Sequence, residues 1–410
     1  MRTTGPWPLD PTVTFLNHGS FGACPEPVLA AQAAWRERIE ADPVRFFSRE
    51  LEGHLDAART TLGEFLGADP EGIAFVPNAT TAVGTVLGSL RFGPGDELLT
   101  TDHEYNATLN SLAAAARRDG ARMVVARVPF PVADPGLVVE AVLSAVTDRT
   151  RLALISHVTS PTGIVFPIAE IVRELDRRGI DAIVDAAHAP GMVPAEVGRL
   201  GAAYWTGNGH KWLCGPKGAA LLWVREDRRD AIHPLVVSHG ANDPRVEAGL
   251  RSRFRVEFDW PGTVDPTPYL AAADAVALVA GLAPDGGGWP AIQAANHELA
   301  VTARRRLCEA LAVEPPAPEA MLGSMAALVL PVTPSDEAAL ALTKALAEDD
   351  RIEVPVGAWP VLAGRISGGP QATLVRISAQ LYNEPSDYDR LADALVARLS
   401  PSTGGPPPRR

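Results

Sequence analysis

The sequence lacks any long unbroken apolar segment. No window approaches the roughly 18 consecutive apolar residues that a membrane-spanning helix requires. The first residues, MRTTGPWPLDPTVTFLNHG, contain no apolar core of the kind that directs export. We therefore expect no membrane partner and a cytoplasmic location.

Cysteine and positive charge are also scarce. The chain of 410 residues has 3 cysteines, and their wide spacing and odd number argue against a disulfide framework or a paired-cysteine metal site. Lysine and arginine total 37 against 49 acidic residues, which gives a net charge of −12, and the basic residues form no stripe. We therefore expect no nucleic-acid partner.

What is present is the composition of an ordinary globular protein, with 46% hydrophobic and 21% charged residues. Apolar runs bounded by Gly and Pro alternate with amphipathic helices in the first two thirds of the chain. This alternation predicts an α/β fold with a mostly parallel seven-stranded sheet that is covered by helices. Strands are expected at 72–77, 96–101, 122–128, 151–158, 181–187 and 219–224, with helices at 80–90, 106–120, 137–146 and 167–179.

The order of predicted helices and strands changes near residue 266. Long Ala-rich helices at 268–282 and 290–311 lead into strands at 325–332, 351–356 and 372–379 and helices at 336–349 and 386–399, a pattern typical of a smaller α+β domain. We therefore divide the chain into an N-terminal arm, a large domain, a small C-terminal domain with its linking helix, and a flexible tail. Their bounds are 1–20, 21–265, 266–400 and 401–410.

Polar segments follow the expected strands, at the edge where ligands of such sheets gather. They read PNATTA, DHEYNA, HVTSPTG, DAAHAPG and TGNGHKW. NATTAV opens a helix with small and hydroxyl residues, which is typical of an anion site at a helix N-terminus. Taken alone, Asn78 or Thr80 would equally be read as a helix cap.

Nucleotide-binding motifs are absent. GNGHKW lacks the last glycine of the dinucleotide motif G-x-G-x-x-G, and no G-x-x-x-x-G-K-[ST] occurs. Pyridoxal phosphate fits the segments better, because it needs a lysine for its aldehyde, an anion site for its phosphate and an acid partner for its ring nitrogen. Asp185, at the end of the apolar run DAIVD, suits the last role.

A metal site is the competing interpretation. Asp185, His188 and His210 are all possible ligands. Such a site would leave the lysine in GNGHKW and the anion-binding helix terminus unexplained. We therefore expect no metal.

Taken together, the motifs resemble the class V, fold-type I pyridoxal-phosphate enzymes, and in particular their isopenicillin-N-epimerase-like branch. FLNHGSFG, NATTA, DHEYNA, HVTSPTG, VDAAHAPG and GNGHKWLCGPKG carry the resemblance over about residues 15–382. It implies that Lys211 forms the Schiff base, whereas Lys217 belongs to the loop before the next strand. It also implies a homodimer with the active site at the subunit interface, where Gly262 and Thr263 reach the phosphate of the neighbouring subunit.

The resemblance assigns further cofactor contacts. Ala79 and Thr80 would bind the phosphate, with Asn208 and His210 nearby, and His188 would lie beside the phenolic oxygen.

The ring itself needs two partners. The resemblance pairs Asp185 with the pyridinium nitrogen and stacks His103 on the ring. Tyr105, in the same loop, is a candidate catalytic or substrate-facing group. The alternative for His103 is a hydrogen-bonded structural histidine.

The substrate implied by the resemblance is a small molecule of the amino-acid type. Arg376 matches the arginine that grips the α-carboxylate, where a planar guanidinium binds in a bidentate manner. Asn17 and Ser20, in the arm, are the other expected substrate contacts. The alternative for Arg376 is a strand arginine paired with surface carboxylates.

The expected chemistry begins with loss of the Cα proton to Lys211. The outcome that we favour is β-elimination of sulfur from a cysteine S-conjugate, because relatives of this branch include C–S lyases and Tyr105 could protonate the leaving sulfur. Epimerisation, transamination and decarboxylating deamination of a thiol-conjugated antibiotic intermediate are the alternatives. Desulfuration is disfavoured, because residues 351–376 contain no cysteine to act as nucleophile. A scaffold protein without cofactor would have no use for a Lys211–Asp185 pair.

Overall fold

The computed structural model describes residues 5–360 and 369–399, so the tail at 401–410 lies outside the described residues. Its central element is a seven-stranded sheet in which β8 runs opposite to the other six strands. The remaining pairs are parallel, which confirms the predicted sheet. In spatial order the strands are β2 (Ile73–Val76), β8 (Ala220–Val224), β7 (Tyr204–Asn208), β6 (Asp181–Asp185), β5 (Thr150–Ser156), β3 (Glu97–Thr101) and β4 (Arg122–Ala126).

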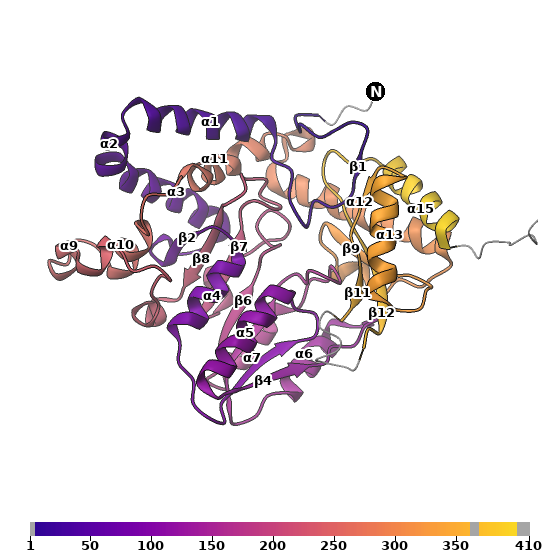
Figure 1. Cartoon of the computed structure of the whole chain (residues 1–410), viewed down its shortest axis with the longest axis horizontal. Coiled ribbons are helices and arrows are strands. Elements are labelled where there is room, and N and C mark those ends of the chain that lie inside the picture. The colour runs from indigo at the N-terminus through magenta and orange to yellow at the C-terminus, as the bar shows by residue number, and fades with distance from the viewer. Residues whose placement is uncertain (1–4, 361–368, 400–410) are drawn as a thin grey trace, which may run out of the picture.

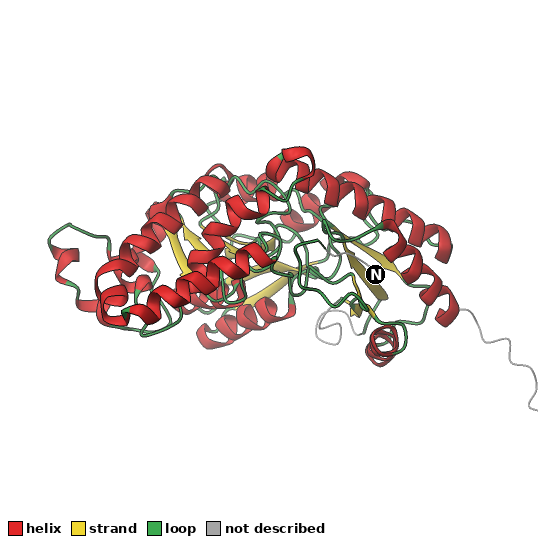
Figure 2. Cartoon of the chain, turned by 90° about the horizontal axis from the view of Figure 1, so that it is seen from above, coloured by secondary structure: helices red, strands yellow, loops and turns green. Residues whose placement is uncertain are grey.

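Helices cover both faces of this sheet (Figure 2). Its central strands are buried along nearly their whole length, which explains why they read as continuous apolar runs. One buried cluster lies under α4 (Ala79–Ser89), α5 (Asn106–Asp119) and α10 (Arg253–Asp259). The other lies under α1 (Glu26–Ala41), α3 (Leu51–Leu66), α6 (Pro135–Ser144), α7 (Ile168–Asp176), α8 (Val197–Leu200) and α11 (Thr267–Ala280).

Local signals set the ends of these helices. Asn78 caps α4, because its Oδ1 accepts a hydrogen bond from the Thr81 N–H at 2.8 Å. Gly120 ends α5 with a φ of 73°, a left-handed conformation that glycine adopts without strain. The sequence predicted both boundaries to within a residue or two.

The C-terminal region packs a three-stranded antiparallel sheet against helices, as expected (Figure 1). The single strand predicted at 351–356 is instead split at Val354 and Pro355 into two short strands of different sheets. The elements are α12 (Gly288–Leu311), β9 (Met325–Val329), α13 (Asp336–Glu348), β10 (Ile352–Glu353), β11 (Val356–Trp359), β12 (Ala372–Ser378) and α15 (Pro385–Leu399).

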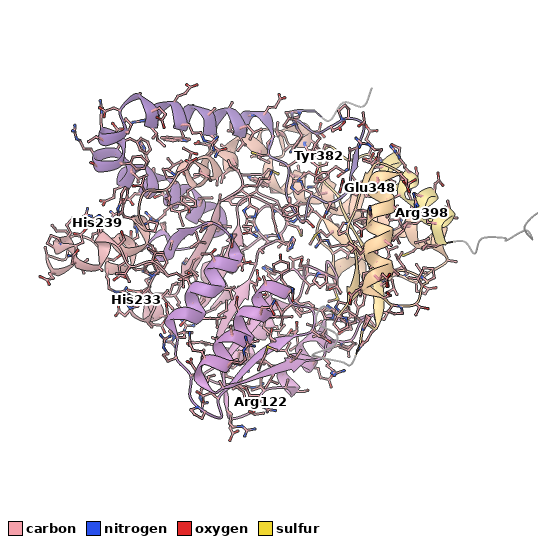
Figure 3. The ribbon with its side chains drawn as sticks, viewed as in Figure 1. Arg122, His233, His239, Glu348, Tyr382 and Arg398 are labelled. Carbon is pink, nitrogen blue, oxygen red and sulfur yellow. The ribbon has the colours of Figure 1, made fainter. Side chains whose placement is uncertain are left out.

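The N-terminal segment joins the two regions. Its strand β1 (Thr14–Phe15) pairs in parallel with β10, far along the chain. His18 Nδ1 lies 2.8 Å from the hydroxyl of Tyr382. Figure 3 labels Tyr382, which lies where the N-terminal segment meets the C-terminal region. The arm therefore forms a two-stranded sheet with the C-terminal region and, through Leu16, packs into its core.

Helices α1 and α3 had no counterpart in the sequence interpretation. The buried positions of α1 are few, Val28, Gln32 and Ile39, so its apolar periodicity is weak. Both helices pack on α11, which lies inside the range 266–400 yet buries its apolar face in the larger core.

Short elements complete the fold. They are α2 (Pro43–Arg45), a π-helical turn at Phe46–Glu50 and α9 (Pro244–Glu247). None of the helices in residues 5–360 and 369–399 combines the length and apolar character needed to cross a bilayer.

Candidate active site

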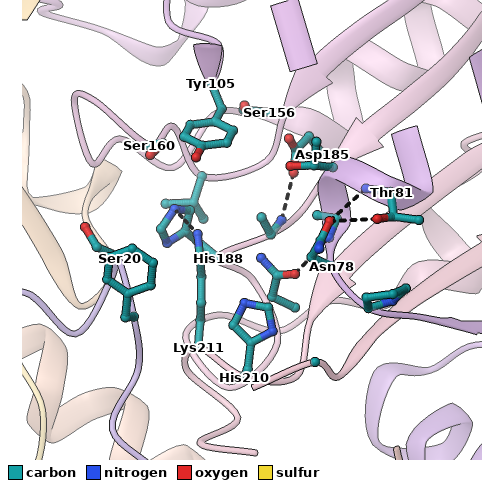
Figure 4. Close-up of a pocket in the computed structure, with 18 residues that line it drawn as sticks. Ser20, Asn78, Thr81, Tyr105, Ser156, Ser160, Asp185, His188, His210 and Lys211 are labelled. Atoms are coloured by element: carbon teal, nitrogen blue, oxygen red, sulfur yellow. Dashed lines mark hydrogen bonds between the residues drawn. The ribbon is translucent and has the colours of Figure 1, made fainter. Parts of the chain in front are cut away.

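A cavity of about 620 Å³ opens at the carboxyl ends of the parallel strands (Figure 4). All the polar segments that the sequence placed after strands contribute to it, because parallel strands end at one edge of the sheet. The lining residues are Ser20, Phe21, Pro77, Asn78, Ala79, Thr80, Thr81, Tyr105, Ser156, Val158, Ser160, Asp185, Ala187, His188, Asn208, His210, Lys211 and Gly218.

Lys211 extends into the cavity from the loop after β7. Its Nζ lies 3.1 Å from His188 Nε2, and His188 Nδ1 accepts a hydrogen bond from the indole N–H of Trp212. Burial and the nearby charge of Arg376 lower the pKa of Lys211 to about 7, against the opposing effect of Asp185. The amine is therefore available in its neutral, nucleophilic form near pH 7.

Lys217 does not line the cavity. Its Nζ donates a hydrogen bond to the carbonyl of Gly22 at 2.5 Å, which ties the loop to the N-terminal segment. Of the lysines in GNGHKWLCGPKG, Lys211 is therefore the one placed for covalent chemistry.

Asp185 ends β6 at the floor of the cavity. It is 4% exposed, and its Oδ1 accepts a hydrogen bond from the Ala187 N–H at 3.0 Å. Burial raises the pKa of Asp185, whereas the Ala187 hydrogen bond and the charge of Lys211 lower it. A cationic partner in the cavity would complete the pairing of this carboxylate.

The N-terminus of α4 faces the same cavity. Asn208, at the end of β7, accepts a hydrogen bond from the Ala79 N–H at 2.9 Å and so fixes the helix end against the sheet. Thr80 follows in the first turn, and His210 lies across from it with its Nδ1 3.0 Å from the carbonyl of Ala219. The arrangement offers an anion the positive end of a helix dipole together with hydroxyl groups.

Arg376 lies in a smaller adjoining cavity of about 210 Å³, which shares Ser20, Tyr105 and Ser160 with the first. Its Nη2 donates to Ser20 Oγ at 2.9 Å and to Asn17 Oδ1 at 3.4 Å, and its Nη1 donates to the Ser160 carbonyl.

No carboxylate pairs with this guanidinium within the part of the chain that is described. Arg376 is 6% exposed, and its buried Nε has no hydrogen-bond partner there. A strand arginine paired with surface carboxylates is therefore not what the structure contains. A buried, incompletely satisfied guanidinium is instead suited to an incoming carboxylate.

His103 is not among the residues that line the cavity. Its ring nitrogens lie 2.8 Å from Thr162 Oγ1 and 3.2 Å from the carbonyl of Val128, and its ring packs edge-on against Trp359. Burial lowers its pKa to about 4. Stacking of His103 on the ring stays a prediction of the resemblance. The next side chain that reaches the cavity is Tyr105, which is 48% exposed.

Other expected residues lie apart from the cavity. Gly262 and Thr263 belong to the loop after α10.

Cys24, Cys214 and Cys308 are all buried, and burial raises the pKa of each thiol. Within the described ranges, no three His, Cys, Asp or Glu side chains converge as a metal site.

The sequence interpretation missed several lining residues. Ser160 follows β5 in the segment HVTSPTG, Ser156 is the last residue of β5, and Thr81 and Phe21 adjoin residues that were named. Position after a strand was the signal for Ser160, and position at the end of a strand was the signal for Ser156. Sequence spacing alone did not say which of them faces inward.

Comparisons with known proteins agree with this geometry. The family model described as "Aminotransferase class-V" matches residues 22–391. The chain belongs to the class-V aminotransferase family. Among class-V relatives it is 36% identical to isopenicillin N epimerase of Streptomyces clavuligerus, over 95% of this chain and 96% of that protein. It is 32% identical to a probable chloroplastic L-cysteine desulfhydrase of Arabidopsis thaliana, over 94% and 83%.

Solved structures share the fold of this chain. The complex of the cystine C–S lyase C-DES with cysteine persulfide superposes with a TM-score of 0.76 at 22% identity, covering 93% of this chain and 97% of that one. The cysteine desulfurase CsdA of Escherichia coli gives 0.75 at 22% identity, with 96% of each chain covered. The fold predicted from the sequence is confirmed.

The chain is thus a pyridoxal-phosphate-dependent enzyme of the class-V family. The residues present fit that cofactor: a buried lysine with a pKa lowered to about 7, a buried carboxylate that makes no ion pair among the described residues and a helix N-terminus all face one cavity. The cavity volume is in the range of sites for small ligands.

Proposed function

We propose that the chain binds pyridoxal phosphate in the 620 Å³ cavity and eliminates sulfur from a cysteine S-conjugate. The observation that carries the proposal is the convergence of Lys211, Asp185 and Tyr105 on this cavity, with buried Arg376 at its edge. When bound, the cofactor would withdraw electrons from the substrate Cα.

The cofactor would be held at both ends. Ala79 and Thr80 at the start of α4, with Asn208 and His210 nearby, bind its phosphate. Asp185 keeps a proton on its ring nitrogen.

His188 plays a supporting part in this proposal. It lies beside the phenolic oxygen, and its Nε2 also contacts Lys211 Nζ.

The substrate is held by its carboxylate. The guanidinium of Arg376 donates hydrogen bonds to the substrate carboxylate. Ser20 and Asn17, in the arm, orient this guanidinium. Lys211 then takes the Cα proton, because its neutral amine is a base at pH 7.

Tyr105 completes the elimination. As the C–S bond breaks, sulfur leaves with the bonding electron pair and takes the phenolic proton of Tyr105, which water restores. The remaining amino-acid fragment leaves as an enamine and reacts with water to give a 2-keto acid and ammonia. The relatives named as desulfhydrases are consistent with this outcome. Desulfuration is disfavoured, because every cysteine thiol is buried.

Epimerisation at Cα is the second candidate. Lys211 and Tyr105 are separate acid–base groups that line one cavity, so one could remove the Cα proton and the other return it. The relatives named isopenicillin N epimerase are consistent with this reaction.

The cofactor assignment is tested by substituting the lysines. Lys211→Ala is expected to lose the absorbance band of lysine-linked cofactor and all turnover. Lys217→Ala, the matched control from the same loop, is expected to keep the band. Loss of the band in Lys217→Ala with retention in Lys211→Ala would reverse the assignment.

The reaction type is tested in deuterated water with a panel of cysteine conjugates and peptide-like amino acids. Elimination predicts release of a thiol with a 2-keto acid and ammonia. Tyr105→Phe should then slow thiol release more than exchange of the Cα proton. The reason is that the phenolic proton of Tyr105 is transferred to sulfur only after Cα is deprotonated. Deuterium at an inverted Cα without fragmentation would favour the epimerase, and amino transfer to an added keto acid would favour an aminotransferase.

A homodimer is part of the proposal. Thr263 is exposed in the loop after α10, and the large apolar side chains of Val237 and Leu250 are 80% and 77% exposed. In the proposed homodimer the loop with Gly262 and Thr263 reaches the phosphate site of the other copy. A cytoplasmic location stays a prediction of the sequence.

Mixed dimers test that arrangement. If Thr263→Trp inactivates the enzyme, mixing it with Lys211→Ala should restore activity, because one site then combines Lys211 from one chain with Thr263 from the other. No recovery, or full activity of Thr263→Trp alone, would contradict a contribution from the neighbouring subunit.

A further inference from the structure

A buried carboxyl group lies directly behind the floor of the cavity. Glu104 follows β3, has no exposed surface and does not line the cavity. Its Oε1 accepts hydrogen bonds from the Ser156 N–H at 2.8 Å and from Thr101 Oγ1 at 3.2 Å. Its Oε2 lies 2.5 Å from Ser156 Oγ. Ser156 therefore contacts both oxygens of this carboxyl.

Ser156 connects Glu104 to the cavity. It is the last residue of β5, lines the cavity and pairs in register with Asp185 on the neighbouring parallel strand. Register partners on parallel strands present their side chains to the same side of the sheet. The Ser156 hydroxyl and the Asp185 carboxylate are therefore neighbours at the cavity floor (Figure 4).

The surroundings of Glu104 favour its neutral form. Burial, together with the charge of Asp185, raises the pKa of Glu104 to about 8 against the opposing effect of the hydrogen bonds from Ser156 and Thr101. No ion pair to Glu104 is present in residues 5–360 and 369–399. Two buried carboxylates this close are costly to ionise together, so the charge stays on one of them.

Glu97, at the opposite end of β3, shows the contrasting case. It is equally buried, but Arg122 and Arg149 lie 2.5 and 2.9 Å from its Oε1. The hydrogen bond from Arg122 holds the pKa of Glu97 below its ordinary value. One strand thus carries an ion-paired carboxylate at its start and an unpaired carboxyl at its end, beside the cavity.

We propose that Glu104 is a positioning residue, which donates its carboxyl proton to Ser156 Oγ and thereby turns the Ser156 O–H toward the cavity beside Asp185. Glu104 touches neither substrate nor cofactor and acts through Ser156. The cavity floor then presents one negative charge, on Asp185, and one hydrogen-bond donor, on Ser156. The inference rests on the proposed binding of pyridoxal phosphate in this cavity.

Glutamine is the informative substitution. In Glu104→Gln the amide NH₂ can donate to Ser156 Oγ while the amide oxygen accepts from the Ser156 N–H, as in the neutral acid. We expect this variant to bind pyridoxal phosphate within about 2-fold of the wild type and to keep its absorbance spectrum. Glu104→Ala and Ser156→Ala should each weaken binding by about 10-fold, the typical effect of one hydrogen bond to a charged group.

The double variant tests whether Glu104 acts through Ser156. Glu104→Ala combined with Ser156→Ala should bind the cofactor no more weakly than either single variant. Glu97→Gln is the matched control: its melting temperature should fall, because the charge-assisted hydrogen bond from Arg122 and the ion pair with Arg149 are lost, while cofactor affinity and spectrum stay unchanged.

The measurements are cofactor titration, the spectrum of the lysine-linked form and thermal melting, all at pH 7. Wild-type affinity in Glu104→Ala or Ser156→Ala would overturn the proposal, as would a Glu104→Gln variant as weak as Glu104→Ala. If Glu104→Ala does not fold, the Gln and Ser156 variants decide. A wild-type chain without the lysine-linked band would reject the proposed function itself.

Discussion

The lowered proton affinity of Lys211 allows a quantitative prediction. With a pKa of about 7, roughly 90% of this amine is neutral at pH 8, whereas a lysine at the ordinary value is roughly 0.3% neutral. The buried site therefore enriches the nucleophilic form roughly 300-fold. We expect the reactivity of Lys211 in the cofactor-free chain to rise with a midpoint near pH 7.

Competitive labelling measures that midpoint. Trace acetic anhydride is added between pH 5 and 11, and mass spectrometry reports the modified fraction of each lysine. Lys344, which is exposed on α13, is an internal reference for reagent chemistry. The position of the midpoint, unlike the absolute rate, does not depend on how easily the reagent enters the cavity.

Two substitutions test the causes of the shift. The charge of Arg376 lowers the pKa of Lys211 and that of Asp185 raises it. Arg376→Gln should therefore move the midpoint upward, and Asp185→Asn should move it downward. A wild-type midpoint above pH 9, or shifts of the opposite sign in both variants, would refute the reasoning.

Three further predictions concern stability. Asn78→Ala removes the cap of α4 and should lower the free energy of unfolding by about 1 kcal/mol in urea titrations, while Asn78→Asp should not. Gly22→Ala would place a Cβ 2.5 Å from the Lys211 carbonyl and should lower the melting temperature and cofactor affinity; Gly53→Ala, with nothing within 4 Å, should do neither. Each histidine with a lowered pKa should also reduce stability from about pH 6.5 to pH 4, by up to about 1.4 kcal/mol per pH unit, because the unfolded chain takes up protons that the folded one does not. Glu104 and Asp102, whose pKa values are raised by burial, act in the opposite direction over this range. NMR titration midpoints near pH 6.5 for the imidazoles would contradict the lowered pKa values of His18, His103, His157 and His210.

Much of the cavity lining could be predicted from the sequence. Asp185 and Lys211 each follow a buried apolar run, and in a parallel sheet the ends of such runs meet at one edge. The helix cap at Asn78 could be predicted equally well, because capping depends on residues within one helical turn. These features follow from local chain chemistry plus a topology that the alternating pattern already implied.

Residues 103–105 mark the limit of that reasoning. His103, Glu104 and Tyr105 are consecutive, and their order gives no indication of which one faces the cavity. Contacts from distant segments decide it: Trp359 and Thr162 hold His103 away from the cavity.

Long-range pairing decided the rest. The partner of Glu104 comes from β5, and the arm is fixed by pairing β1 with β10 near the other end of the chain. The sequence determined the strand order along the chain, the lysine and the carboxylate, because short-range patterns encode them. Only the tertiary structure determined that Tyr105 faces the cavity, that Glu104 is buried and that the arm packs on the C-terminal region. Each of these depends on contacts between segments that lie far apart in the sequence.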